Sequence, residues 1–182
     1  RRSGTNRMVQ VMNSTAFDDR FTRLTGDQKT GGQKPLPWQR RLFGLFRDGQ
    51  IPAGVDIPTG LGKTRVIDLW LLALAEGAPL PRRLVYVVDR RAVVDQATTE
   101  ALRLAKALKT DHELMTALGL RDDLPAQTLR GQQRLDRSWR SEPDGPAIFV
   151  GTVDMVGSRL LFSGYGTSSG ARPIEAGLLG CD

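Results

Sequence analysis

Cysteine, histidine and long apolar runs are scarce or absent in this chain, and each absence excludes a class of protein. Cys181 is the single cysteine, which excludes an internal disulfide and a cysteine-based zinc site. His112 is the single histidine, so a nuclease centre built from several histidine and aspartate ligands is excluded as well. No apolar run is long enough to span a bilayer, and residues 1–4 lead into no signal-peptide core. We therefore expect a cytoplasmic protein without a membrane partner.

Lysine is also scarce, since 5 lysines stand beside 21 arginines in a chain of net charge +6. Arginine-rich basic chains suit phosphate backbones, because the guanidinium fork binds oxygens two at a time. A GC-rich genome that favours arginine codons, on a merely soluble surface, would produce the same composition. Charge by itself leaves these two interpretations open.

The length of 182 residues suffices for one α/β domain with a proper core and is too short for two well-developed ones. Residues 1–34 are polar and read as an N-terminal extension and loop, with a short amphipathic helix at residues 16–24. Residues 35–182 hold the remaining regular elements. The chain starts without Met and ends in Cys181-Asp182 after a Gly-Leu-Leu-Gly segment, so we expect both ends to belong to something longer.

Residues 56–64 read DIPTGLGKT, between a β-prone approach at residues 53–55 and an apolar helical run at residues 65–76. A strand, a glycine-rich turn ending in Gly-Lys-Thr and a helix form a phosphate-binding P-loop. Gly60 and Gly62 let the backbone turn tightly and aim its N–H groups at an anion, at the positive end of the following helix. Lys63 would reach the β- and γ-phosphates of ATP, and the Thr64 hydroxyl would ligate Mg²⁺.

The strict form of this motif has a glycine five residues before Gly62, where this chain has Ile57. Nucleic-acid helicases and translocases of superfamily 2 replace that glycine and read Pro-Thr-Gly-x-Gly-Lys-Thr, which is the sequence of residues 58–64. The alternative is a glycine-containing turn with a chance Lys-Thr, which the expected strand and helix disfavour.

Pro35 and Pro37 precede a helix whose apolar face carries Trp38, Leu42, Leu45 and Phe46. Gln39 lies in its first turn and looks like the adenine-reading glutamine of superfamily 2. Its amide can donate to and accept from the adenine edge at once. A solvated glutamine on an amphipathic helix is the alternative. The predicted nucleotide-binding residues are Gln39, Thr59, Gly60, Leu61, Gly62, Lys63 and Thr64, with Lys63 and Thr64 as the catalytic residues and Thr64 as the metal ligand.

Strand and helix patterns alternate along the chain, which predicts an α/β fold. The expected strands are residues 84–88, 126–129 and 147–150, and the expected helices after the P-loop helix are residues 92–109 and a helix carrying Val153, Val156 and Leu160. The β-branched run at residues 84–88 is typical of a parallel strand covered on both faces. Such alternation favours right-handed βαβ crossovers and a parallel sheet with its site at the carboxyl ends of the strands.

Four segments together resemble the first RecA-like lobe of the CRISPR-associated signature helicase–nuclease of type I systems, and most nearly its type I-G (formerly I-U) branch. They are residues 37–39 (PWQ), 56–64 (DIPTGLGKT), 85–96 (VYVVDRRAVVDQ) and 150–161 (VGTVDMVGSRLL). The resemblance covers about residue 17 to the end. It implies that residues 35–182 are an incomplete RecA-like, three-layer P-loop NTPase lobe.

The resemblance also implies partners and DNA-contacting residues. The family uses ATP to reel single-stranded DNA, cuts it with a metal-dependent nuclease, and is recruited by an RNA-guided surveillance complex. The implied DNA-binding residues are Arg90, Arg91, Arg130, Thr152 and Asp154. Arginines in loops at the carboxyl ends of strands can grip phosphates without reading sequence. Each residue could instead be only a strand-end cap or a turn.

ATP hydrolysis in this family needs an Asp-Glu-x-His box, and no Asp-Glu pair occurs in the chain. The family places that box shortly beyond Asp182, and a second lobe supplies its arginine fingers. We therefore expect a piece that binds ATP, does not hydrolyse it alone, and works with the rest of a helicase chain. The first alternative is a module that binds nucleic acid or a partner protein without nucleotide chemistry. A small P-loop kinase is disfavoured, because nothing after Thr64 supplies its lid or substrate site.

Overall fold

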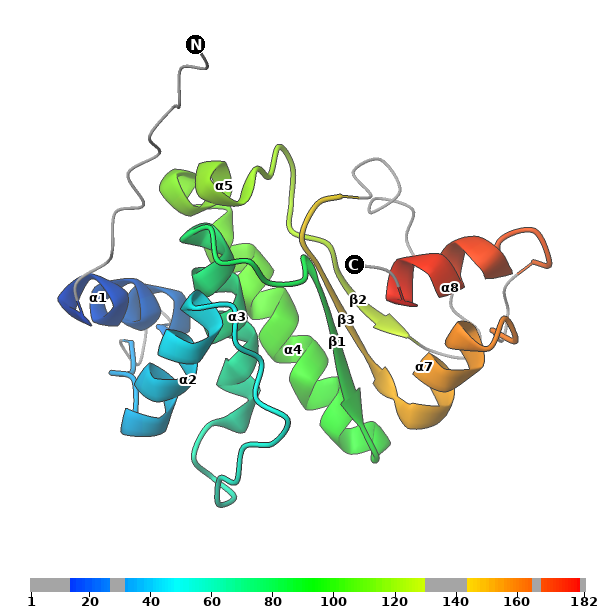
Figure 1. Cartoon of the computed structure of the whole chain (residues 1–182), viewed down its shortest axis with the longest axis horizontal. Helices are drawn as coiled ribbons and strands as arrows, with labels where there is room; N and C mark the ends of the chain where they lie inside the picture. The colour runs from blue at the N-terminus through cyan, green and yellow to red at the C-terminus, as the bar shows by residue number, and fades with distance from the viewer. Residues whose placement is uncertain (1–13, 27–31, 130–143, 165–167, 181–182) are drawn as a thin grey trace, which may run out of the picture. The chain divides into compact units, whose positions relative to one another are not determined.

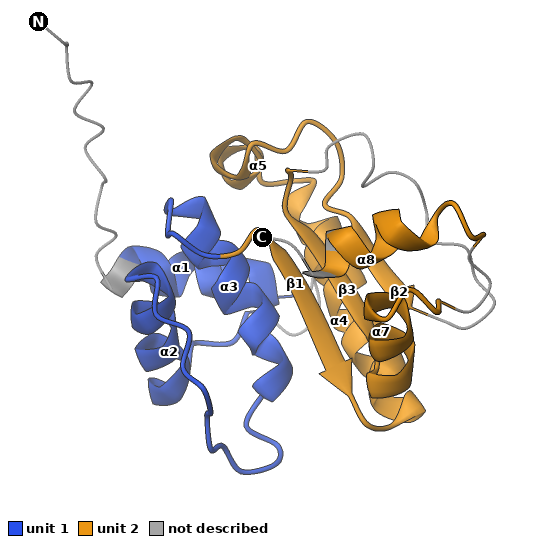
Figure 2. Cartoon of the chain, turned by 45° about the vertical axis from the view of Figure 1, so that its right-hand side comes forward, with its two compact units in different colours: residues 1–80 blue, residues 81–182 orange. Residues whose placement is uncertain are grey.

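The computed structural model describes residues 14–26, 32–129, 144–164 and 168–180. In this part of the chain it contains seven α-helices and one sheet of three parallel strands, so the predicted α/β class with a parallel sheet is confirmed (Figure 1). The chain divides into two compact units, Arg1–Leu80 (unit 1) and Pro81–Asp182 (unit 2), where the sequence suggested a boundary near residue 34 (Figure 2).

Unit 1 is helical and is built around aromatic side chains. Its helices are α1 (Ser14–Thr25), α2 (Pro37–Arg47) and α3 (Val66–Ala75), with a 3₁₀ turn η1 (Lys63–Arg65) leading into α3. Phe17, Phe21 and Leu24 are buried on α1, as their spacing predicts. The ring of Phe17 stacks on Phe43 of α2, with centroids 4.0 Å apart. Both α1 and α2 contact α3, so residues 14–25 belong to the core of this unit.

The strand expected at residues 53–55 does not form, and this prediction is wrong. Residues 51–59 have no regular structure, and Ala53 and Val55 are exposed. Pro52 and Pro58 have no N–H to donate to a ladder, and Gly54 has no side chain to pack. Of residues 53–55 only Val55 favours a strand, and none of the three is buried, so the chain reaches the P-loop as an irregular loop.

The sheet lies in unit 2 and has the order β1-β3-β2, with β1 (Arg83–Val88), β2 (Ala126–Leu129) and β3 (Ala147–Thr152) all parallel. The central strand β3 is buried along nearly its whole length, as predicted. β1 is an edge strand and is largely half-buried, with Val87 44% exposed. The prediction that β1 is covered on both faces is therefore wrong, because most of its residues are only half-buried and Val87 is exposed.

Helices α4 (Arg91–Leu108), α5 (His112–Leu118), α7 (Val153–Leu160) and α8 (Arg172–Gly180) complete unit 2. α4 contacts all three strands and buries the predicted stripe of Val94, Ala97, Ala101, Leu104 and Leu108. α8 had no assignment from the sequence; it packs on α7, where a buried ion pair joins Arg159 to Glu175 at 3.4 Å. His112 is exposed at the start of α5, as expected. No helix in the described ranges is long and apolar enough to cross a membrane.

Candidate functional site

The turn at residues 60–64 has the backbone of an anion cradle. Gly60 and Gly62 have φ of +83° and +68°, a left-handed conformation that glycine adopts without steric cost. Arg65 N–H donates to the Gly62 carbonyl at 3.0 Å, which starts η1. In the described part of the chain, the N–H groups of residues 60–64 donate no hydrogen bond. Five successive donors thus stand open at the start of a helix, where the dipole favours an anion.

The first turn of α2 lies against this cradle, although 23 residues separate Trp38 from Leu61. The indole Nε1–H of Trp38 donates to the Leu61 carbonyl at 3.1 Å. The amide nitrogen of Gln39 is 3.4 Å from the place that a Cβ on Gly62 would occupy. The structure therefore brings together the two segments, residues 37–39 and 56–64, that the sequence assigned to nucleotide binding.

Gln39 has a structural role that the sequence did not reveal. Its side chain is 3% exposed, and its Oε1 accepts the Leu36 N–H at 2.8 Å, which caps the start of α2. The Gln39 side chain lies next to Gly62, which agrees with its predicted proximity to the P-loop. Adenine recognition by this side chain stays a prediction; its Oε1 already accepts one hydrogen bond and has a second lone pair for another.

The other predicted nucleotide-binding side chains are open. Thr59, Leu61 and Lys63 are exposed and Thr64 is half-buried. A Cβ on Gly60 would meet no heavy atom within 4 Å, so space for a ligand is present beside the turn. The described residues contain no group of three or more potential His, Cys, Asp or Glu metal ligands. Among the predicted site residues, Thr64 is the one whose side chain would ligate Mg²⁺.

Asp68, a residue that sequence reasoning missed, lies one turn beyond the cradle. It is 3% exposed in the first turn of α3 and pairs with Arg65 at 3.7 Å. A carboxylate near a helix N-terminus is favoured by the dipole. The signal that could have revealed it is a single acidic residue within an otherwise apolar helical run.

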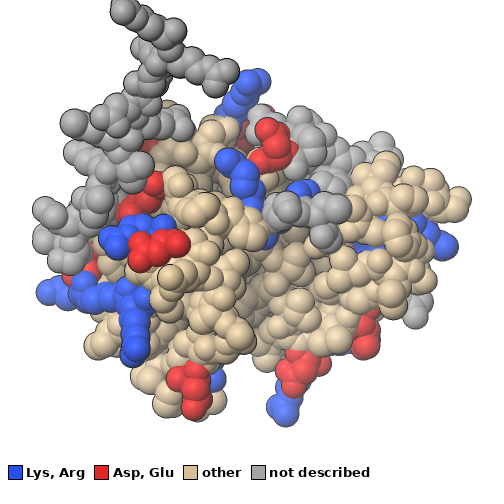
Figure 3. Space-filling view, viewed as in Figure 1, with Lys and Arg blue, Asp and Glu red and all other residues tan. Residues whose placement is uncertain are grey.

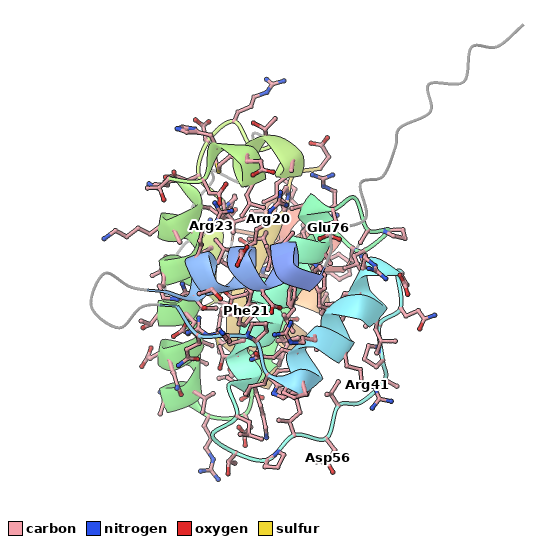
Figure 4. The ribbon with its side chains drawn as sticks, turned by 90° about the vertical axis from the view of Figure 1, so that its left-hand side faces the viewer. Arg20, Phe21, Arg23, Arg41, Asp56 and Glu76 are labelled. Carbon is pink, nitrogen blue, oxygen red and sulfur yellow. The ribbon has the colours of Figure 1, made fainter. Side chains whose placement is uncertain are left out.

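Glu76, at the opposite end of α3, was missed as well. Burial raises the pKa of its carboxyl group, and the nearby guanidinium groups of Arg47 and then Arg20 lower it. Its Oε1 is buried without a hydrogen-bond partner in the described residues. Figure 4 labels Arg20 on α1 and Glu76 at the end of α3, away from the loop that carries Asp56. This carboxylate therefore belongs to the helix packing and lies apart from the cradle.

Four of the five predicted DNA-binding residues lie at one edge of the sheet in unit 2. Val88 is the register partner of Thr152, so β1 and β3 end side by side. Arg90 and Arg91 follow β1, and Thr152 and Asp154 end β3 and begin α7. Both arginines and Asp154 are exposed. The fifth residue, Arg130, lies outside the described residues.

An acidic contact at this edge of the sheet reduces the positive charge that it presents, and a helix-capping contact occupies Thr152. Arg90 lies 3.8 Å from Asp89, with both side chains 80% exposed, so this pair contributes little stability. Thr152 accepts from the Met155 N–H at 3.4 Å and caps α7. On the face drawn in Figure 3, blue and red side chains are interspersed and form no single basic patch.

No family model, curated protein or solved structure matches this chain. The geometry of the two regions is thus the basis on which a function can be inferred. Among the described residues, the P-loop turn supplies unbonded backbone donors and an exposed lysine, and the sheet edge supplies exposed arginines. The first arrangement suits a polyphosphate, and the second suits a phosphate backbone.

Proposed function

We propose that this chain is the ATP-binding part of an ATP-dependent DNA helicase or translocase of superfamily 2 that acts in CRISPR antiviral defence. The observation that supports this best is the row of unbonded N–H groups at residues 60–64, in a turn that ends in Lys63 and Thr64 and continues as a helix. In this proposal, unit 1 carries the nucleotide site and unit 2 carries the sheet of an incomplete RecA-like lobe.

Each residue of the cradle has a distinct part in holding ATP. The N–H groups of residues 60–64 donate to the phosphate oxygens, and the Lys63 ammonium neutralises the β- and γ-phosphates. The Thr64 hydroxyl is the protein ligand for Mg²⁺, whose remaining ligands are phosphate oxygens and water. Bound Mg²⁺ would neutralise charge on the transferred phosphoryl group.

Hydrolysis requires groups that this chain does not contain. An Asp-Glu-x-His box would supply the carboxylates for Mg²⁺ and for the attacking water, and no Asp-Glu pair is present. The 182 residues therefore bind ATP without turning it over, and the rest of the helicase chain completes the site. The surveillance complex is the partner that would recruit the assembled enzyme.

Single-stranded DNA is the proposed partner of the sheet edge in unit 2. Arg90 and Arg91 would hold backbone phosphates, with Thr152 and Asp154 on the adjoining turn. Contacts of this type carry no sequence information, as a translocase requires. Binding should weaken steeply as salt concentration rises.

Calorimetric titration of the chain with Mg-ATP tests the nucleotide site. Lys63→Ala should weaken binding about tenfold to a hundredfold, because a charge-assisted contact to phosphate is lost. Lys106→Ala is the matched control: it removes the same charge from an exposed position on α4 in unit 2 and should leave affinity unchanged. Equal affinities of wild type and Lys63→Ala would disprove the proposed site.

A binding module without nucleotide chemistry is the second candidate, favoured by the exposure of Arg90 and Arg91 at one sheet edge. Binding of single-stranded DNA that depends on salt but is indifferent to ATP and to Lys63→Ala would support this module. DNA affinity that changes when Mg-ATP is added would support the translocase instead.

A further inference from the structure

The indole of Trp38 is the group that joins α2 to the cradle. Its Nε1–H bond to the Leu61 carbonyl measures 3.1 Å. In the part of the chain that the structure describes, no other side chain donates to the backbone of residues 60–64. Trp38 stands outside the P-loop motif, and neither the motif nor the expected role of Gln39 assigns it a function.

The peptide between Leu61 and Gly62 explains why this bond matters. A trans peptide is planar, so its C=O and its N–H point in opposite directions. No cis peptide occurs in the described residues. With the Leu61 carbonyl directed at Trp38, the Gly62 N–H of the same peptide points away from the indole. That N–H is one of the five open donors of the cradle.

The glycine that follows this peptide makes its orientation easier to change. Gly62 populates positive and negative φ about equally well, and it follows the peptide directly. Rotation of the Leu61–Gly62 peptide therefore meets little steric resistance on the Gly62 side and would exchange the open N–H for a carbonyl oxygen. A carbonyl oxygen facing a phosphate repels it, so one peptide flip would remove one donor and weaken anion binding at the cradle.

We infer that Trp38 is a positioning residue for the phosphates of the nucleotide. It holds the Leu61 carbonyl and thereby keeps the Gly62 N–H available to a phosphate oxygen. The inference rests on the proposed function, because it assumes that a polyphosphate occupies the turn. It deepens that proposal by assigning phosphate affinity to a side chain of α2. The effect should be independent of the base, since the peptide faces the phosphates.

Titration calorimetry with two probes, inorganic tripolyphosphate and ATP, each with Mg²⁺, tests the inference on the full chain. Trp38→Phe keeps an aromatic ring and removes the N–H donor. It should weaken the binding of both probes by the same factor, about three- to tenfold, the usual worth of one hydrogen bond. Trp70→Phe, at a buried position on α3, is the matched control and should bind both probes like wild type.

The outcomes separate this inference from the proposal on which it rests. Equal loss for both probes in Trp38→Phe, with Trp70→Phe unchanged, supports the clamp. Wild-type affinity in Trp38→Phe overturns the clamp and leaves the proposed function intact. A loss confined to ATP also overturns it, because the indole would then act on the base. Wild-type protein that binds neither probe overturns the proposed function and the clamp together.

A spectroscopic measurement decides the matter if Trp38→Phe fails to fold. In ¹⁵N-labelled wild type, the Trp38 indole N–H should exchange slowly with solvent and shift when tripolyphosphate is added. Trp70→Phe and Trp139→Phe spectra leave Trp38 as the remaining assigned indole signal. An indole that exchanges as fast as an exposed one and does not shift overturns the inference.

Discussion

The P-loop turn in unit 1 and the sheet edge in unit 2 were both predicted to bind phosphates, yet they are built in different ways. The turn holds five backbone donors open and is supported from a distant segment through Trp38. At the sheet edge, Thr152 caps its own helix and Arg90 lies near its neighbour Asp89. Phosphate binding at the turn is therefore supported by its backbone geometry. At the sheet edge it is supported only by where the residues lie and by their charge.

The two units also differ in the interactions that stabilise each of them internally. Unit 1 is packed around aromatic side chains, with Phe17 stacked on Phe43, and in its ion pair between Arg65 and Asp68 the carboxylate is the more deeply buried partner. Unit 2 adds a buried ion pair between Arg159 and Glu175, which are 1% and 5% exposed. Burial lowers the pKa of Arg159 and the carboxylate of Glu175 raises it again.

The largest expected effect is on this ion pair. Glu175→Gln leaves a guanidinium buried without its counter-charge and should destabilise unit 2 by about 3–5 kcal/mol. Hydrogen exchange of the β3 amides at increasing urea concentration measures this loss of stability. The α3 amides serve as the internal reference for unit 1. The double variant Arg159→Met, Glu175→Leu is the matched control, since an apolar pair of similar size should restore most of the stability. Equal losses in α3 and β3 would show that the units unfold together.

A smaller effect is expected at the cradle. Gly62→Ala places a Cβ on a residue with φ +68°, which costs about 1–2 kcal/mol, and the strain should also weaken tripolyphosphate binding. Gly44→Ala is the control in the same unit: its Cβ would meet nothing within 4 Å inside α2, and it should stabilise by roughly 0.5–1 kcal/mol. Thermal melting of both variants should show a lower melting temperature for Gly62→Ala and a higher one for Gly44→Ala. A neutral Gly62→Ala would mean that the turn does not need its left-handed conformation.

The smallest effect concerns Glu76 and depends on pH. Burial raises its pKa above the ordinary value of 4.5, so the folded protein binds this proton more tightly than the unfolded chain. The stabilisation that this bound proton contributes is therefore fully present below pH 4.5, and it is lost as the pH rises through the pKa of the folded protein. Glu76→Gln should match wild type near pH 4 and exceed it at pH 7 in urea midpoint. An identical pH dependence of the two proteins would contradict this assignment.

Much of the local structure could be predicted because it depends on near neighbours in sequence. The spacing of Phe17, Phe21 and Leu24 places them on one face of any helix, and α1 buries all three. Gly77, with φ +80°, ends the run that forms α3, as expected. β3 follows from its continuous apolar run, and α4 follows from the helical spacing of its apolar residues.

Two of the failures have a common cause in contacts that distant segments make. The pattern at residues 84–88 was strong enough to predict a strand but could not show that β1 occupies an edge. The missing strand at residues 53–55 has a local cause instead, since Pro52, Gly54 and Pro58 disfavour a ladder. Glu175 gave no sign that it would meet Arg159, because neither partner's burial can be read from its own neighbours.

The sequence by itself determined the composition of the candidate cradle, two glycines before Lys63 and Thr64, and the periodicity of the helices and strands. These properties are local, since they depend on backbone freedom and on residues three or four positions apart. Only the tertiary structure decided that α2 packs against the turn, that Trp38 holds Leu61, and that β1 and β3 end together. Those contacts join residues more than twenty positions apart, and they form because packing brings together side chains that no local pattern connects.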